Sequence, residues 1–387
     1  MALNQASFAH DVPGLLNKPL NTTTRRIFVA ATRQNDGKTT TSLGLFGALH
    51  SLGHKVSYIK PVAQRIVEVE NGVEVDEDTF LLNSVYDVKI PIAAMSPVAV
   101  DSAFTRRYLD DPETLSPRIA DTICRAFDRA AYEKDIIIVE GSGHAGVGSV
   151  FNASNADNAR LLGSKVIIVS SGGIGKPVDE IAMNKALFDD RGVECIGVIL
   201  NKVLPEKMPD IRKYVSRALD RLGVPLLGLL PLENTLSSPN LSQIVSEIGG
   251  RWIVPLVKGR SQRAEHIIVG AMSAQHIFDY IRENTLIIAP GDREDLLFTL
   301  IAGAGTSGVP KISGIILSNG LFPAPRLISM LEQVGIPVVA TDRECFESAR
   351  RISRMIVKTQ PGDADKVSTI EALIRKNVDL DRILAAI

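Results

Sequence analysis

The sequence lacks the features that mark secreted, membrane and nucleic-acid-binding proteins. Its 387 residues contain three cysteines, Cys124, Cys195 and Cys345, whose scattered positions argue against a disulfide framework and fit a reducing compartment. No apolar run approaches the roughly 20 residues of a membrane helix, and the polar first residues have no signal-peptide core. A net charge of -1 offers no basic surface. We expect a soluble cytoplasmic protein, with neither nucleic acid nor a membrane as partner.

What the sequence does contain is an alternation of short apolar runs and helical patterns. Most of the runs are apolar throughout, which predicts strands covered on both faces of a parallel sheet. They are "RIFVAAT", "KVSYIKP", "DIIIVEG", "KVIIVSSG", "ECIGVILNK" and "VPLLGLLP". Between them, Ile119, Ile123 and Phe127 show typical helical spacing. The alternation predicts an α/β fold with a doubly wound, mostly parallel sheet.

The same patterns predict how the chain is divided. We expect a flexible N-terminal arm at 1–24 and the doubly wound domain at 25–232. The loop "PLENTLSSPNLS" follows as a domain boundary. A second, smaller α/β domain, with one of its helices at 273–282, is expected at 235–350. A helical C-terminal extension at 351–387 should pack against one of the domains.

A phosphate-binding loop is predicted at 32–39, "TRQNDGKT", between a strand and a helix. Backbone N–H groups at a helix start bind phosphate oxygens, and the helix dipole favours negative charge. Lys38 would neutralise the outer phosphates, and the Thr39 hydroxyl would ligate Mg²⁺. The loop therefore predicts a nucleotide-binding site. The expected nucleotide contacts in the loop are Asn35, Gly37, Lys38, Thr39 and Thr40.

Thr32 stands where this motif usually has its first glycine. A β-branched residue tolerates positive φ badly, so the loop must begin with ordinary backbone geometry. The alternative interpretation is a solvated Gly-Lys turn that merely opens a helix.

Acidic residues near the expected crevice are candidates for a metal site. Glu140 ends the run "DIIIVEG", and the carboxyl end of a central parallel strand faces the ligand crevice. It can hold Mg²⁺ there, or simply cap the strand end. Asp76 and Asp78 form a second acidic arm, for which a capping role at a helix start is the alternative.

Two further strand ends carry polar residues. Lys60 could contact the γ-phosphate or an anionic substrate, although surface lysines are common at strand ends. The amide of Asn201 offers the donor and acceptor that a purine edge requires, although an isolated Asn-Lys pair indicates little. Arg33 could stabilise γ-phosphate charge, and His144 could orient a substrate, although both could also be ordinary loop residues. The loop "SSGGIGKP" (170–177) lacks the hydroxyl residue after Lys176 and fits a strand-to-helix turn.

Together, "RQNDGKTTTSLGL", "YIKPVAQ", "DEDTFLL", "IIIVEGSG" and "GVILNKV" resemble the dethiobiotin synthetase family over about residues 25–230. The resemblance implies a P-loop fold that uses Mg-ATP, with Thr39, Asp78 and Glu140 at the metal. It implies catalytic roles for Lys38, Lys60 and Glu140, and adenine recognition by Asn201. The family's Lys-Pro-Val-Ala-Ser segment reads "KPVAQ" here, and its Glu-Gly-Ala-Gly-Gly reads "EGSGHAGVGS". Both departures fall where the diamine substrate would lie.

A second resemblance covers nearly the whole chain. "EGSGHAGVGSV", "SSGGIGKPVDE", "VGAMSAQHIFDYI" and "APGDRED" are similar to the N-terminal part of long phosphotransacetylases, where a dethiobiotin synthetase-like domain precedes a DRTGG domain. We expect no acetyltransferase domain in this chain, so phosphotransacetylase activity is not inferred from the resemblance. Dimeric relatives imply a homodimer.

Two functions remain open at this stage. An ATP-dependent enzyme would transfer the γ-phosphoryl group to a small carboxylate or carbamate, largely by positioning and charge stabilisation, and such a site could also take an amine substrate. A nucleotide-sensing regulator would pass the ATP-bound state through the DRTGG-like domain to a metabolic enzyme. A glutamine-dependent amidotransferase is disfavoured, because Cys345 lacks a glycine-rich elbow and no histidine follows His276.

Overall fold

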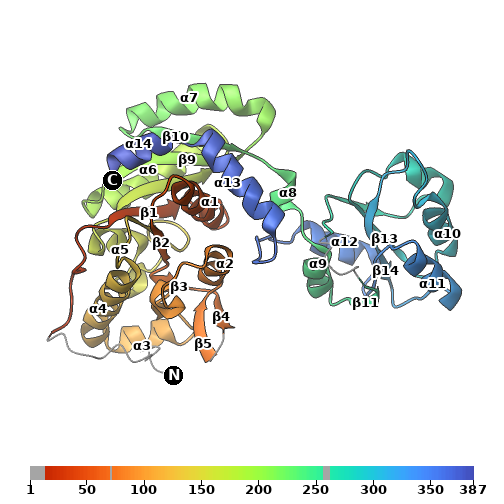
Figure 1. Cartoon of the computed structure of the whole chain (residues 1–387), viewed down its shortest axis with the longest axis horizontal. Coiled ribbons are helices and arrows are strands. Elements are labelled where there is room, and N and C mark those ends of the chain that lie inside the picture. The colour runs from red at the N-terminus through yellow and green to blue at the C-terminus, as the bar shows by residue number, and fades with distance from the viewer. Residues whose placement is uncertain (1–13, 70–71, 256–261) are drawn as a thin grey trace. The chain divides into compact units, whose positions relative to one another are not determined.

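The computed structural model describes residues 14–69, 72–255 and 262–387 (Figure 1). Contacts divide the chain into two compact units. Unit 1 comprises Met1–Leu232 together with Thr359–Ile387, and unit 2 comprises Glu233–Lys358. Unit 2 is therefore inserted between two parts of unit 1.

Unit 1 is built on a six-stranded parallel sheet in the order β10-β9-β8-β1-β7-β2. The strands are β1 (Arg25–Ala31), β2 (Val56–Ile59), β7 (Ile136–Glu140), β8 (Lys165–Ser171), β9 (Cys195–Val203) and β10 (Leu226–Pro231). All the residues of β2 and β7 are buried. This confirms the prediction of parallel strands covered on both faces.

Helices cover both faces of this sheet. One face packs on α4 (Pro112–Ala130), α5 (Asn155–Leu161), α6 (Gly175–Asp190) and α7 (Met208–Arg221) around a shared apolar core. On the other side lies α1 (Lys38–Ser51), which contacts β1, β2 and β7. The doubly wound α/β prediction is confirmed.

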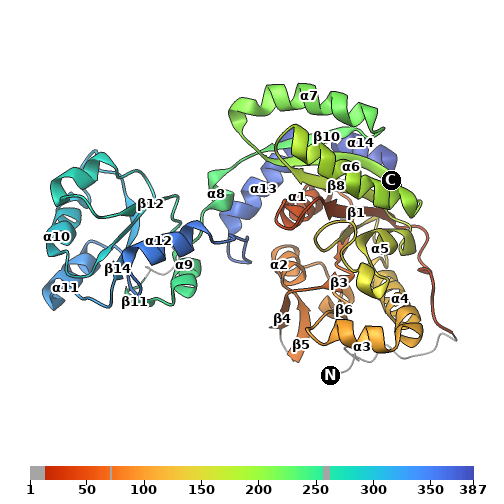
Figure 2. The same cartoon turned by 180° about the vertical axis from the view of Figure 1, so that it is seen from behind.

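The C-terminal segment returns to unit 1 after unit 2. Helix α13 (Ala364–Asn377) packs along α1 and contacts β10, and α14 (Leu380–Ala386) follows it (Figure 2). Val378 pairs with Gly228 of β10. The expected division at 350/351 falls inside α12 (Cys345–Ser353), which contacts α9 and β13 of unit 2, so the segment 351–387 is shared between the units.

The start of unit 1 is tied to α4. The Leu16 N–H donates to Asp121 at 2.8 Å, and the Thr24 hydroxyl donates to the carbonyl of Ala131 at 3.0 Å. Residues 14–24 of the expected flexible arm are thus hydrogen-bonded to the domain, whereas residues 1–13 lie outside the described residues.

Smaller elements connect β2 to α4 on the β2 side of the sheet. They are β3 (Val62–Ala63), β4 (Ile66–Val69), β5 (Val73–Asp76), α2 (Glu77–Tyr86), η2 (Ile92–Met95), β6 (Val98–Ala99) and α3 (Phe104–Asp110). Strands β4 and β5 form an antiparallel hairpin, which places Asp76 at the start of α2. Farther along unit 1 lie the short helices η3 (Ser149–Phe151) and η4 (Pro205–Lys207).

Unit 2 contains a five-stranded mixed sheet in the order β11-β15-β14-β13-β12. Only β11 is antiparallel to its neighbour. The elements of unit 2, in chain order, are α8 (Asn234–Ser237), α9 (Leu241–Ile248), β11 (Arg251–Val254), β12 (His266–Val269), η5 (Ala274–Asp279), β13 (Thr285–Pro290), α10 (Glu294–Gly303), β14 (Ile312–Ser318), α11 (Pro325–Gln333), β15 (Val338–Ala340) and α12. The second α/β domain is confirmed, although the helix expected at 273–282 is the shorter 3₁₀ segment η5.

Candidate functional site

The loop between β1 and α1 has the geometry that a phosphate-binding loop requires. Gly37 adopts φ 105° immediately before α1, a conformation open to glycine but strained for other residues. A side chain there would also collide with Asn201, because a Cβ on Gly37 would lie 1.9 Å from Asn201 Nδ2. The sequence therefore needs glycine at this position for two separate reasons.

The loop carbonyls are held from outside by side chains of neighbouring elements. Asn201 Nδ2 donates to the carbonyl of Asp36 at 3.0 Å, and Lys202 Nζ donates to that of Asn35 at 2.7 Å. Within the described part of the chain, no backbone N–H from 33 to 39 donates to a protein acceptor. A run of available N–H groups that opens a helix is a binding site for anionic oxygens.

Thr32 begins this loop without positive φ, as its β-branched side chain requires. Its hydroxyl donates to Asp36 Oδ2 at 2.7 Å and lies 2.9 Å from the Ser170 hydroxyl of β8. These contacts are buried and join the first residue of the loop to its later part. The residue in place of glycine thus closes the loop through its side chain.

Lys38 supplies the positive charge of the site. It is only 8% exposed, and no carboxylate among the residues that the structure describes lies within 4 Å of its ammonium group. Burial lowers the pKa of Lys38 below its ordinary value, because a desolvated ammonium is disfavoured. A buried cation without an ion pair fits a site whose ligand brings negative charge.

Glu140, at the end of β7, lies beside the loop and is fully buried. Thr39 Oγ1 donates to its Oε1 at 3.1 Å, and the Tyr58 hydroxyl donates to its Oε2 at 3.1 Å. Burial and the charge of Asp78 raise the pKa of Glu140 to about 7. Burial and the charge of Glu140 likewise raise the pKa of Tyr58 well above its ordinary value, which keeps its hydroxyl a donor.

Lys60 brings three carboxylates together at the edge of the sheet. Its ammonium donates to Asp76 at 2.8 Å and to Asp78, and lies 4.0 Å from Glu140 Oε1. Although burial alone would lower it, the charges of Asp78, Glu140 and Asp76 raise the pKa of Lys60 well above its ordinary value. The three carboxylates therefore favour the charged form of Lys60 beside the P-loop.

Asp76 and Asp78 differ in their surroundings. Asp76 is the N-cap of α2 and accepts from the Asp78 N–H at 3.0 Å and the Gln64 N–H at 3.1 Å, in addition to Lys60. These bonds show the capping arrangement that the sequence left as an alternative. The side chain of Asp78 points toward Lys60, on the same side as Glu140.

The donors near the loop fit a bound Mg²⁺. Among the described residues, no cluster of three or more His, Cys, Asp or Glu side chains forms a ready-made cage. Mg²⁺ bound with a nucleotide usually takes one or two carboxylates together with phosphate oxygens and water. The Thr39 hydroxyl, bonded to Glu140 with Asp78 nearby, offers ligands of that kind.

Among the other sequence candidates, Arg33, His144 and Asn201 have hydrogen-bond or ion-pair partners within the protein. Arg33 pairs with Glu180 of α6. His144 is exposed, and its ring accepts from the Gly146 N–H at 3.2 Å. Lys176 is exposed in the first turn of α6. The Asn201 side-chain Nδ2 donates to the P-loop, and its Oδ1 accepts from the Lys202 N–H at 2.9 Å, so adenine recognition by Asn201 stays a prediction.

Sequence reasoning missed three residues that shape the site: Asp36, Tyr58 and Asn184. The Asn184 Nδ2 lies 3.5 Å from the carbonyl oxygen of Thr32, and its Oδ1 accepts from the Ala145 N–H at 2.7 Å. Asn184 therefore joins the phosphate-binding loop to the loop that follows β7. Of these three, only Tyr58 could have been found from the sequence. It stands within the apolar strand "VSYI", and a hydroxyl in a fully buried strand needs a hydrogen-bond partner.

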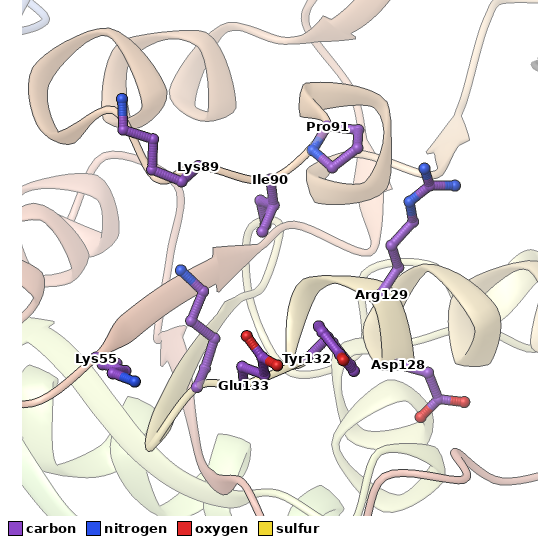
Figure 3. A pocket seen from close by; sticks show the side chains of 9 residues that line it. Lys55, Lys89, Ile90, Pro91, Asp128, Arg129, Tyr132 and Glu133 are labelled. Atoms are coloured by element: carbon purple, nitrogen blue, oxygen red, sulfur yellow. The ribbon is translucent and has the colours of Figure 1, made fainter.

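A surface pocket of about 660 Å³ lies elsewhere on unit 1 (Figure 3). Two of its lining residues, Lys55 and Lys134, precede β2 and β7, so it lies at the amino edge of the sheet, opposite the P-loop. Burial and the charge of Lys55 lower the pKa of Lys134. Figure 3 shows that the charged ends of Lys55, Lys89 and Arg129 do not converge, so these groups do not define one anion site.

No helix among the described residues is both long and apolar enough to span a membrane.

Two family models match consecutive parts of the chain. Residues 25–240 match AAA_26, described as an AAA domain, and residues 243–355 match the DRTGG domain. The phosphate acetyltransferase of Nitratidesulfovibrio vulgaris is 24% identical over 363 residues, which are 91% of this chain and 50% of that protein. That of Pseudomonas putida is 26% identical over 364 residues, with the same coverage. The chain spans about half the length of these relatives.

Solved structures with similar folds include nucleotide-binding proteins. The septum site-determining protein MinD of Pyrococcus horikoshii, complexed with Mg-ADP, is 19% identical and has a TM-score of 0.35, covering 55% of this chain and 83% of its own. Cobyrinic acid a,c-diamide synthase of Mycobacterium smegmatis, with bound ADP and magnesium, is 16% identical with a TM-score of 0.36, covering 54% and 87%.

The AAA_26 match covers more than half of the chain and includes the whole parallel sheet of unit 1, from β1 to β10. The chain belongs to the AAA_26 family of dethiobiotin synthetase-like P-loop domains, here followed by a DRTGG domain.

Proposed function

We propose that unit 1 binds Mg-ATP at the P-loop and either hydrolyses it or transfers the γ-phosphoryl group to a small carboxylate or carbamate substrate. The observation that carries this proposal is the buried Lys38 ammonium, which has no ion pair among the described residues and shares its loop with a run of available N–H groups. A triphosphate would satisfy both at once. A cytoplasmic homodimer is part of the same proposal.

Each polar residue has a role in this proposal. Lys38 would neutralise the outer phosphates, and Asn35, Gly37 and Thr40 would contribute backbone or hydroxyl donors. Thr39, Asp78 and Glu140 would hold Mg²⁺, which supplies charge neutralisation at the phosphates. Lys60, now held by Asp76 and Asp78, would stabilise charge on the transferring group.

An ATP-sensing regulator is the second candidate, and one observation favours it. The segment that leaves unit 2 forms α13, which packs along α1, the helix that begins at Lys38. A change in α1 on nucleotide binding would therefore reach the connection to the DRTGG domain. The partner that responds to the nucleotide-bound state would be a metabolic enzyme.

ATP turnover and nucleotide binding by the purified chain test the proposal. Lys38→Ala should weaken ATP binding by roughly tenfold to a hundredfold, since it removes a charge-assisted contact. Lys176→Ala is the matched control, because this exposed lysine follows the other glycine-rich turn.

Turnover that Lys38→Ala abolishes supports the enzyme, and binding without turnover supports the sensor. If the wild-type chain binds no ATP, both candidates fail.

A further inference from the structure

Tyr58 lies at the centre of the site and belongs to none of its expected residues. It is part of the buried strand β2 and is fully enclosed. Its hydroxyl donates to Glu140 Oε2 at 3.1 Å, across from the neighbouring strand β7. The contact therefore joins two adjacent strands just where they reach the P-loop edge of the sheet.

A phenylalanine would fill the same volume without a polar group. The flanking residues of β2 are buried, and a buried hydroxyl is unfavourable unless it finds a partner. Here that partner is the carboxylate at the candidate metal site. The tyrosine is thus better explained by what its hydroxyl does to Glu140 than by packing.

The two oxygens of Glu140 have different donors. Oε1 accepts from Thr39, which belongs to the P-loop, and Oε2 accepts from Tyr58, which belongs to the rigid sheet. A Thr39 hydroxyl that binds a cation through its oxygen keeps its O–H and can still donate to Oε1, but its position then follows the loop and its ligand. The bond from Tyr58 is independent of the loop and can persist.

We propose that Tyr58 is a positioning residue, which fixes the carboxylate of Glu140 so that Oε1 faces the divalent cation bound with the nucleotide. This inference rests on the proposed function. It assigns to Tyr58 a role in metal affinity and none in binding the nucleotide itself. Groups that orient a metal ligand in this way typically change metal affinity by tenfold or more when removed.

The test is a titration of fluorescent N-methylanthraniloyl-ATP binding against free Mg²⁺, with a parallel titration in EDTA. Tyr58→Phe should raise the Mg²⁺ concentration for half-maximal binding on the order of tenfold, while binding in EDTA stays as in the wild type. Tyr86→Phe is the control, because it removes another tyrosine hydroxyl that bonds a glutamate, Glu371, at 2.8 Å. It should titrate like the wild type.

A double-mutant cycle separates positioning from a general effect. In a Glu140→Gln background, Tyr58→Phe should cause no further shift, because the group it orients is no longer a carboxylate. If Tyr58→Phe alone fails to fold, a shift of the double variant relative to Glu140→Gln still overturns the role of Tyr58.

Each outcome is distinguishable from failure of the proposed function. An unshifted Tyr58→Phe curve, or an equal shift in the Glu140→Gln background, overturns the role of Tyr58 while leaving nucleotide binding intact. A wild-type chain that binds no nucleotide overturns the proposed function instead.

Discussion

At the scale of single residues, the protonation of Glu140 should govern metal binding. Burial and the charge of Asp78 raise its pKa from 4.5 to about 7, so the carboxyl is neutral below that pH and charged above it. Metal ligation needs the charged form. We predict that Mg²⁺ affinity of the nucleotide complex rises with pH up to about 7 and then levels off, as measured by Mg²⁺ titration at several pH values.

The control for this prediction is Glu140→Gln, which lacks the titrating carboxyl and should lose its contribution to the pH dependence.

In the absence of metal, the free energy of unfolding should have the opposite pH dependence. Between about pH 4.5 and about pH 7 the folded state keeps a proton on Glu140 that the unfolded chain loses, so the free energy of unfolding should fall as the pH rises through this range. A wild-type pH profile identical to that of Glu140→Gln would contradict the assignment.

Residue types near the loop were predictable to different degrees. Lys38, Thr39 and Glu140 could be found because strand ends and a Gly-Lys-Thr motif fix their place. The bond between Thr32 and Asp36 could not, since it depends on how the loop closes in space. Tyr58 lay in a recognised strand, but its partner lies 82 residues away in the sequence.

At the scale of elements, α1 differs from an ordinary surface helix. Ten of its 14 residues are buried, because the sheet covers one side and α13 the other. Gly44 permits that contact. A Cβ there would lie 2.3 Å from Ile374 and 3.2 Å from the carbonyl of Ile370.

We therefore predict that Gly44→Ala lowers the free energy of unfolding by about 1–2 kcal/mol in chemical denaturation. Overpacking against α13 should outweigh the gain of about 1 kcal/mol that alanine brings to a helix. Gly175→Ala is the matched control, since nothing lies within 4 Å of its Cβ position, and it should be neutral or slightly stabilising. A stabilised Gly44→Ala protein would refute the packing argument.

Element prediction succeeded where burial produced a distinct pattern. The six strands of unit 1 were recognisable because both faces are covered and the sequence is continuously apolar. The hairpin β4-β5 was missed, since its residues are mostly half-exposed and its strands have only four residues each. The helix predicted at 273–282 is the shorter 3₁₀ segment η5 in the structure. Ile277 is the only buried residue of η5, so burial gives this segment no helical pattern.

At the scale of the whole molecule, helical spacing alone could not show to which unit each C-terminal helix belongs. α12 packs with unit 2, whereas α13 packs on the P-loop helix. The two helices are close neighbours in the sequence, yet their stabilising contacts lie in different units. A ligand of unit 1 should therefore change the free energy of local unfolding of α13 and leave that of α12 unchanged.

Hydrogen exchange on the intact chain can measure this difference. We predict that Mg-ATP at a hundred times its dissociation constant slows exchange in α13 and α1 alike by about a hundredfold, for amides that exchange through opening of unit 1. Amides of α12 should keep their rate, because they open with unit 2. Lys38→Ala at the same ATP concentration is the control and should remove most of the slowing. Equal slowing of α12 and α13 would mean that the two units open together, and an unchanged α13 would mean that it is not stabilised through α1.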